Sequence, residues 1–238
     1  MTDTPALLPK HNRARRVLFV AFPDVGVLDL TGAQTVFWAA TKAMEARGLK
    51  GYERCTASLA GGLVRSAEGL ELMTAKLSDF RPSSVDTLVV PGSPHMASVL
   101  DASAPLVTWL KRASRVTRRT ASVCSGAFLL AAAGLLDAKR ATTHWLMFDM
   151  MTARFPTVQI DRDAIFVQQD SVWTSAGVTA GIDLALALVE ADCGHEIAME
   201  VARELVVFLK RPGGQSQFSE LLRAQADDTA TFDELNLW

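Results

Sequence analysis

The sequence contains few cysteines: Cys55, Cys124 and Cys193 are the only three in 238 residues. They are too few and too far apart for a disulfide framework, and no Cys-x-x-Cys pair indicates a zinc site. A sparse, odd number of thiols fits a reducing compartment, so we expect a cytoplasmic protein. We expect neither a resident metal nor a cofactor.

Long apolar segments are also absent. The N-terminus is polar and carries a basic Arg13, Arg15 and Arg16 cluster, without the apolar core of a signal peptide. The most apolar later run, residues 182–189, is too short to cross a bilayer. These absences predict no membrane partner, and residues 1–14 are expected to form a disordered tail.

A strong net charge is absent as well. The formal net charge is −2, so the chain lacks the basic footprint of a DNA-binding domain. Basic residues do gather between Asp101 and Asp137, and we interpret them as a solvated helix face rather than a phosphate site, because solvated charge is the default for such runs. They are Lys111, Arg112, Arg115, Arg118 and Arg119.

Apolar residues make up 49% of the chain and recur in periodic blocks, as in globular domains. Strand-like runs alternate with helical patterns, which predicts βαβ units and the α/β class, with a mostly parallel sheet. Strands are expected at 16–22, 85–90, 119–123 and 140–143, with two or three more within 157–175. Helices are expected up to about Arg47 and at 104–115, 124–134, 145–154, 179–191 and 195–209.

Two local patterns refine this picture. Thr31 and Gln34 have capping-box spacing at the start of the first helix, and Gly48 is a plausible stop. Residues 52–60 and 63–76 alternate between apolar and polar on either side of Gly61-Gly62. They predict two strands of a smaller hairpin-like element.

Three strand ends carry residues suited to chemistry. Asp29 follows the first strand, Gly92 and Ser93 follow the strand at 85–90, and Cys124 follows the strand at 119–123. In parallel sheets of this kind, ligands bind at the carboxyl ends of the strands. We therefore expect these residues to line one cleft.

Cys124 lies where Ser-Val-Cys-Ser-Gly joins a strand to a helix. The unpaired N–H groups of a helix N-terminus lower the pKa of a thiol and favour the thiolate. The N–H of Ser125, with those of Gly92 or Ser93, could bind a developing oxyanion. The alternative is a small buried cysteine that fills space.

Two neighbours of the expected cleft have alternative interpretations. Asp29 suits either a helix N-cap or, if Thr31 and Gln34 cap that helix, a position facing the thiol. His144 is either a pocket residue or a packed structural histidine. His95 and the turn at 177–181 are further candidates for the rim of the pocket.

Four segments together carry a family resemblance: FPDVGVLDLTG (22–32), VVPGS (89–93), SVCSGAFLLAAAGLLDAKRATTHW (122–145) and TSAGVTAGIDLAL (174–186). They resemble the ThiJ/PfpI superfamily of class I glutamine amidotransferase-like domains. The resemblance implies a flavodoxin-like three-layer sandwich over residues 15–211. It implies that Cys124 is the elbow cysteine, Asp29 its acidic neighbour and His144 the pocket histidine, with Gly92 and Ser93 as oxyanion donors.

The chain departs from the peptidase-like members of this superfamily. Ser125 follows the cysteine where they carry histidine, and Asp29 stands where many carry glutamate. Both features are closer to isocyanide hydratases, and closer still to the N-terminal sensor domains of AraC/GlxA-type transcription regulators. Residues 202–219 and 232–238 resemble the end of such a sensor domain and the start of a DNA-binding domain. Residues 212–238 are therefore expected to connect to a helix-turn-helix domain beyond this chain.

The resemblance implies a cytoplasmic, homodimeric sensor domain that binds a small effector, such as an amine or amino-acid derivative, at the Cys124 cleft. DNA would be bound only through the C-terminal domain, and the chain would sense rather than catalyse. One alternative is a cysteine-dependent hydratase or hydrolase. Another is redox sensing through a Cys124 thiol of low pKa. The apolar face of the helix at 195–209 could form the dimer contact or belong to the core.

Overall fold

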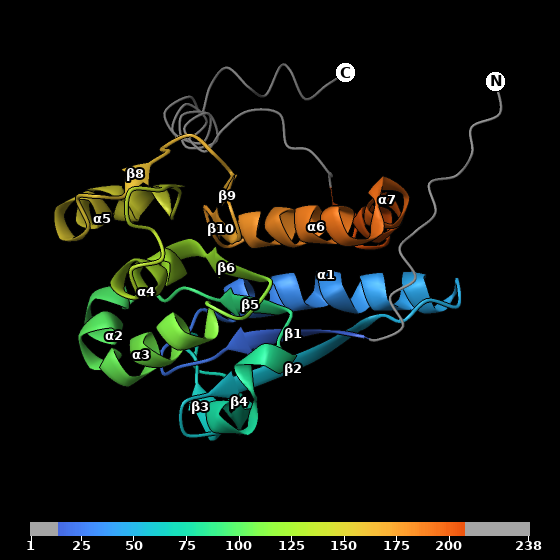
Figure 1. Ribbon diagram of the computed structural model, residues 1–238, viewed down its shortest axis with the longest axis horizontal. Helices are drawn as coiled ribbons and strands as arrows, with labels where there is room; N and C mark the ends of the chain where they lie inside the picture. The colour runs from blue at the N-terminus through green and yellow to red at the C-terminus, as the bar shows by residue number, and fades with distance from the viewer. Residues whose placement is uncertain (1–13, 208–238) are drawn as a thin grey trace, which may run out of the picture.

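A computed structural model describes residues 14–207, and its central feature is an eight-stranded sheet with helices on both faces (Figure 1). The expected tail, apart from residue 14, and the expected connector at 212–238 lie outside the described residues. The helices and strands are β1 (Arg15–Val20), α1 (Val27–Glu45), β2 (Tyr52–Ser58), β3 (Gly62–Arg65), β4 (Glu71–Lys76), β5 (Thr87–Val90), α2 (Met96–Ala102), α3 (Ala104–Ala113), β6 (Arg119–Val123), α4 (Ala127–Ala132), β7 (Arg140–Ala141), α5 (Phe148–Arg154), β8 (Gln159–Ile160), β9 (Phe166–Gln169), β10 (Val172–Ser175), α6 (Ala180–Cys193) and α7 (His195–Glu204).

The strand order in the sheet is β3-β4-β2-β1-β5-β6-β10-β9. Neighbouring strands are parallel throughout the stretch β4-β2-β1-β5-β6-β10. The two outermost pairs, β3 with β4 and β10 with β9, are antiparallel. After β1 the chain goes to β2 on one side and returns to β5 on the other. The carboxyl ends of β1 and β5 therefore flank a topological switch point, where open α/β sheets bind ligands.

Two helical layers cover this sheet. Helices α1, α6 and α7 contact one another on one face, where Figure 1 shows α1 and α6 running side by side, and α2 and α3 both contact α4 on the other. Residues 17–20 of β1 are fully buried, as expected of a strand covered on both faces. The expectation of a three-layer α/β fold with a mostly parallel sheet is confirmed.

The expected hairpin at 52–60 and 63–76 is wrong in its strand pairing. Strand β2 belongs to the main sheet and pairs in parallel with β1, while the hairpin consists of β3 and β4 inside the second segment. A turn divides that segment: the Ser66 amide donates to the Leu70 carbonyl at 2.8 Å, and Gly69 has a φ of +89°. Glycine adopts this left-handed conformation without steric cost, so the chain reverses there.

The expected capping box of α1 is also wrong. Gly26 is the N-cap residue, the Thr31 hydroxyl donates to the Val27 carbonyl within the helix, and the Gln34 amide donates to Thr56 on β2. The Glu68 carboxylate, from the β3–β4 turn, accepts the Val27 amide instead. A residue distant in sequence thus satisfies one of the free N–H groups at this helix start.

The basic run is not uniformly a solvated helix face. Arg119 begins β6, is only 3% exposed, and binds the buried carboxylate of Asp192 in the last turn of α6. Arg118 bridges Asp192 and Asp86. These two arginines are therefore part of a structural ion-pair cluster.

Helix α7 packs against α1 and α6, and its residues Ile197 and Val201 are buried. This part of the expected apolar face therefore belongs to the core rather than to a dimer contact. Phe208 and Leu209, which complete the expected face, lie outside the described residues. Within residues 14–207, no helix is long and apolar enough to span a membrane.

Candidate functional site around Cys124

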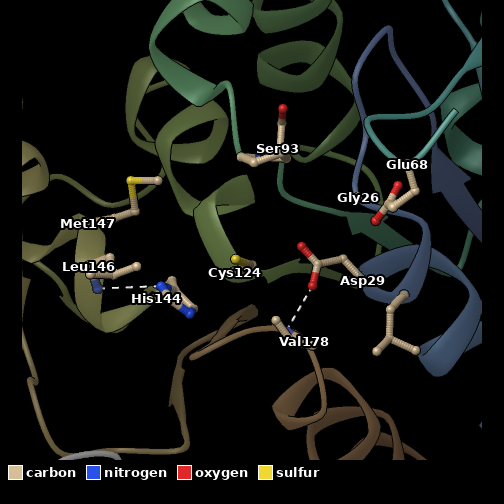
Figure 2. A pocket seen from close by; sticks show the side chains of 11 residues that line it. Gly26, Asp29, Glu68, Ser93, Cys124, His144, Leu146, Met147 and Val178 are labelled. Atoms are coloured by element: carbon tan, nitrogen blue, oxygen red, sulfur yellow. Dashed lines mark hydrogen bonds between the residues drawn. The ribbon is translucent and has the colours of Figure 1, made fainter. Parts of the chain in front are cut away.

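A cavity of about 360 Å³ opens at the carboxyl ends of the parallel strands. Figure 2 shows the sulfur of Cys124 between the side chains of Asp29 and His144. The structure therefore brings these three expected residues to one cavity, although they lie far apart in the sequence. The cavity is lined by Gly26, Leu28, Asp29, Glu68, Ser93, Pro94, Cys124, His144, Leu146, Met147 and Val178.

Cys124 occupies a strained turn between β6 and α4. It begins a short 3-10 turn, Cys124–Gly126, and has a φ of +58°, in the left-handed region that non-glycine residues rarely adopt. The Thr143 hydroxyl donates to the Cys124 carbonyl at 2.8 Å and holds the turn from the neighbouring loop. Backbone strain of this kind often marks a functional site, since the surrounding structure must maintain it.

Gly177 makes room for this turn. A Cβ atom at position 177 would lie 2.3 Å from Cys124 Cβ and 2.7 Å from its sulfur, and the φ of Gly177 is +100°. Any side chain there would both collide with the cysteine and adopt an unfavourable backbone conformation. The close approach of these two segments therefore depends on glycine.

Asp29 faces the thiol and is not an N-cap. Asp29 is 5% exposed, and its carboxylate accepts the amides of Gly92 at 3.1 Å and Val178 at 2.8 Å. Val178 has a φ of +49°, which is strained for a β-branched residue. The alternative interpretation of Asp29 as a cap is wrong, because its oxygens bind the loops after β5 and β10 rather than the start of its own helix.

The expected thiolate at Cys124 is not supported by the surroundings of the sulfur. Burial, reinforced by the negative charge of Asp29, raises the pKa of Cys124 to about 12, although the Ser125 amide acts in the opposite direction. Burial also raises the pKa of Asp29, against hydrogen bonds from Val178, Gly92 and the thiol itself. Desolvation thus outweighs the helix N-terminus, and the thiol is protonated at neutral pH.

The raised pKa of Cys124 removes the premise of the alternative in which this thiol senses oxidants. A low-pKa thiol is the reactive form in oxidation, but burial raises the pKa of Cys55 and Cys193 as well as that of Cys124. None of the three cysteines has the lowered pKa that the redox-sensing interpretation required.

Two of the three amides assigned to an oxyanion, those of Gly92 and Ser93, already have protein acceptors. Gly92 donates to Asp29, and Ser93 donates to the Ser125 hydroxyl at 2.9 Å. That hydroxyl in turn donates to the Ser93 carbonyl at 2.8 Å. An oxyanion would have to displace these bonds, and of Gly92, Ser93 and Ser125 only Ser93 is among the residues that line the cavity.

His144 lines the cavity from the segment before α5. Its Nδ1 accepts the Leu146 amide at 3.3 Å, and burial lowers the pKa of the imidazole, so the ring is neutral at pH 7. No hydrogen bond between its ring and the thiol is present among the described residues. His95 precedes α2 and is not among the residues that line the cavity, whereas Val178, from the expected rim at 177–181, is.

Sequence reasoning missed Glu68 and most of the apolar lining. Glu68 lies in a turn that was expected to be inside a strand, so nothing in the local pattern placed it near Asp29. Leu146 and Met147 fell inside the helix expected at 145–154, and nothing in the sequence indicated that they line a cavity. Within the described part of the chain, no group of three or more His, Cys, Asp or Glu side chains is placed to hold a metal ion.

The chain is similar to known proteins over most of its length. The model of the DJ-1/PfpI family matches residues 15–191. Isonitrile hydratase of Pseudomonas putida is 31% identical over 192 residues, which cover 81% of this chain and 78% of that protein. The HTH-type transcriptional regulator GbdR of Pseudomonas aeruginosa is 26% identical over 205 residues, which cover 86% of this chain.

The regulator is longer than the match: the chain spans 54% of the length of GbdR. The crystal structure of an AraC family transcriptional regulator from Pseudomonas putida has a TM-score of 0.67 at 25% identity, and the match covers 80% of this chain and 99% of that one. The relatives therefore include both an enzyme and transcription regulators.

Proposed function

Since this chain belongs to the DJ-1/PfpI family, we propose that it is the ligand-sensing and dimerising domain of an AraC-type transcription regulator, with a small molecule bound in the Cys124 cavity. The observation that carries the proposal is the cavity itself. It lies at the switch point of the sheet, combines a few polar groups with an apolar lining, and is large enough for a small metabolite.

The state of the thiol favours binding over nucleophilic catalysis. A catalytic cysteine needs a neighbouring base or a lowered pKa. Burial and Asp29 raise the pKa of Cys124, so catalysis would depend on the Asp29 carboxylate as the base. The neutral His144 has no described hydrogen bond to the sulfur that would make it such a base. A protonated thiol beside a buried carboxyl group serves as a polar contact for a ligand.

Regulation would follow from unequal affinity. A ligand shifts a protein between two arrangements only if it binds one of them more tightly. The half-length match to GbdR supports an arrangement in which a separate C-terminal domain contacts DNA. A homodimer would present two such domains to two half-sites, and sedimentation equilibrium of the chain tests that assembly directly.

The test is a thermal-shift screen of small metabolites on the wild-type chain, Cys124→Ser and Asp29→Asn. Because a ligand that binds the folded state stabilises it by mass action, an effector raises Tm increasingly, roughly with the logarithm of its concentration, once it exceeds Kd. We expect at least one compound to raise Tm of the wild type, with a smaller rise in Asp29→Asn. A hit that is unaffected by either substitution would place binding elsewhere and contradict the proposal.

A cysteine-dependent hydratase is the second candidate, favoured by the 31% identity to isonitrile hydratase and by the hydrogen bond between Cys124 and Asp29. In this function the sulfur would bond to the terminal isocyanide carbon while Asp29 transfers the thiol proton to that same carbon, which gives a thioimidate. Water would then add to the carbon, and breaking the C–S bond would release the N-substituted formamide and restore the thiol. The test is formamide production from an alkyl isocyanide. Turnover that disappears in Cys124→Ala would support the hydratase over the sensor.

A further inference from the structure

A second cavity, of about 300 Å³, lies just beyond the carboxyl ends of β1 and β2, beside the junction of α2 and α3. The proposed function makes no use of it, and its lining shares no residue with that of the Cys124 cavity. The second cavity is lined by Ala21, Phe22, Pro23, Ser58, Leu59, Ala60, Gly61, Leu63, Val64, Ala102, Ser103 and Leu106.

No charged side chain is among the described residues that line the second cavity. Its two polar side chains, Ser58 and Ser103, are buried and already hydrogen-bonded. The Ser58 hydroxyl bonds to the Thr74 hydroxyl at 2.7 Å and accepts the Gly61 amide at 3.0 Å. The Ser103 hydroxyl donates to the Val99 carbonyl. The side chains of this lining therefore offer a ligand neither a charge nor an unbonded hydroxyl.

Large apolar side chains are exposed at the mouth of the second cavity. Leu59 and Leu63 line it, although they are 43% and 62% exposed. Val64 and Leu106 are buried and form part of its walls. Exposed apolar side chains that gather around a hollow mark a binding site. A concave site of this kind suits a small molecule, because such a site surrounds most of the surface of its ligand.

The volume and the lining of the second cavity limit the class of ligand. An apolar cavity of about 150 Å³ holds a benzene molecule, and this one has roughly twice that volume. It therefore has room for one or two rings. A charged group would lose its hydration inside without gaining a partner, which is costly.

We propose that the second cavity is a further ligand site, which binds a neutral, apolar molecule of one or two rings. The affinity comes from removing apolar surface of the ligand, and of Leu59 and Leu63 at the mouth, from water. Charged molecules of the same size are excluded, because no side chain of the lining compensates for their lost hydration.

The experiment titrates the chain with three probes that share one ring: toluene, benzylammonium and benzoate. Binding is measured as amide chemical-shift changes in ¹⁵N spectra, with Leu63 and Leu106 as reporters at the second cavity and Leu28 and Val178 at the Cys124 cavity. The key variant is Leu63→Ser, at an exposed position where folding does not depend on the side chain. Met73→Ser is the matched control, because Met73 pairs with Leu63 across the hairpin, is 73% exposed and does not line the cavity.

We expect toluene to shift the amides of Leu63 and Leu106, and to bind there at least about tenfold more tightly than either charged probe. Leu63→Ser should weaken the binding of toluene by about fourfold, the effect of one methylene group left in water. Met73→Ser should leave it unchanged.

Three results would overturn the proposal. Shifts confined to Leu28 and Val178 would mean that apolar molecules enter only the Cys124 cavity. Equal binding of the charged probes would contradict the role of the uncharged lining. Equal losses in Leu63→Ser and Met73→Ser would place toluene on the outer face of the hairpin. None of these results bears on ligand sensing at Cys124, because the two linings share no residue.

Discussion

Asp192 and Asp29 are both buried, and they lie at opposite ends of the parallel sheet. Asp192 faces the strand beginnings, where its carboxylate binds Arg15, Arg118 and Arg119 and accepts the hydroxyl of Tyr52. Asp29 faces the strand ends, where its carboxylate has two backbone amides and the Cys124 thiol but no described cation. The two ends of the sheet thus surround similar groups with different partners.

The difference shows which end the chain uses for stability and which for function. A buried carboxylate that is paired with arginines is fixed in one charge state, and removing either partner leaves an uncompensated charge. A buried carboxylate without a cation can change its charge when a ligand arrives, beside an open cavity. The first arrangement supports the sheet, whereas the second is suited to recognition.

The largest expected effect is at the end of the sheet where the strands begin and Asp192 is paired with arginines. Asp192→Ala should destabilise the protein by about 3–5 kcal/mol, because it leaves Arg119 buried without a counter-charge. Asp29→Asn should cost less, about 1–3 kcal/mol, because no buried cation loses its partner, but the Asn NH2 group cannot accept the second of the two backbone amides that the carboxylate binds. Urea denaturation measures both. A small loss in Asp192→Ala would contradict the assignment of this cluster to stability.

At the carboxyl ends of the strands, where the cavity lies, stability should depend on packing more than on charge. Gly177→Ala should cost about 2–4 kcal/mol, from the overlap with Cys124 together with the left-handed backbone. Gly62→Ala is the control: its φ is +79°, but a Cβ there meets nothing within 4 Å, so only the backbone cost of about 1–2 kcal/mol remains. Equal losses in the two variants would show that the Cys124 turn is looser than described.

The charge of Asp29 should control the reactivity of the thiol. Removing it in Asp29→Asn should lower the pKa of Cys124 from about 12 and speed alkylation by iodoacetamide at pH 8 by about tenfold. Peptide mass spectrometry locates the modified cysteine, and Asp79→Asn, on an exposed turn, serves as the control. An unchanged rate at Cys124 would mean that burial alone protects the sulfur.

The smallest effect should be a difference in how the stability contributed by Asp29 and by Asp86 depends on pH. Asp86 lies near the strand beginnings, where it binds Arg118. The pKa of Asp29 is raised on folding, so the stability it contributes is lost as pH rises above its ordinary value near 4. Burial of Asp86 is outweighed by Arg118, which lowers its pKa, so its contribution is lost as pH falls below that value.

The measurement is the free energy of unfolding between about pH 3 and pH 7. Relative to Asp29→Asn, the wild type should lose stability as pH rises. Relative to Asp86→Asn, it should lose stability as pH falls. Slopes of the same sign would remove the contrast between the two ends.

Much of the fold could be predicted from the sequence, because apolar periodicity reports how each segment is buried. The runs at 16–22, 85–90 and 119–123 became β1, β5 and β6, and the Cys124 elbow followed from the strand-to-helix transition. The pairing of β2 and the capping of α1 could not be predicted. Both depend on partners, β1 and Glu68, that only the folded chain brings near.

The sequence by itself determined that Asp29, Cys124 and His144 would reach one end of a parallel sheet, since each follows or lies beyond a buried strand. Only the tertiary structure decided their chemistry. The pKa of a group depends on the water and charges around it, and those are set by distant segments: the loop at Val178, the turn at Glu68 and the burial of the sulfur itself. For this reason the thiol that looked activated in the sequence is protonated in the folded protein.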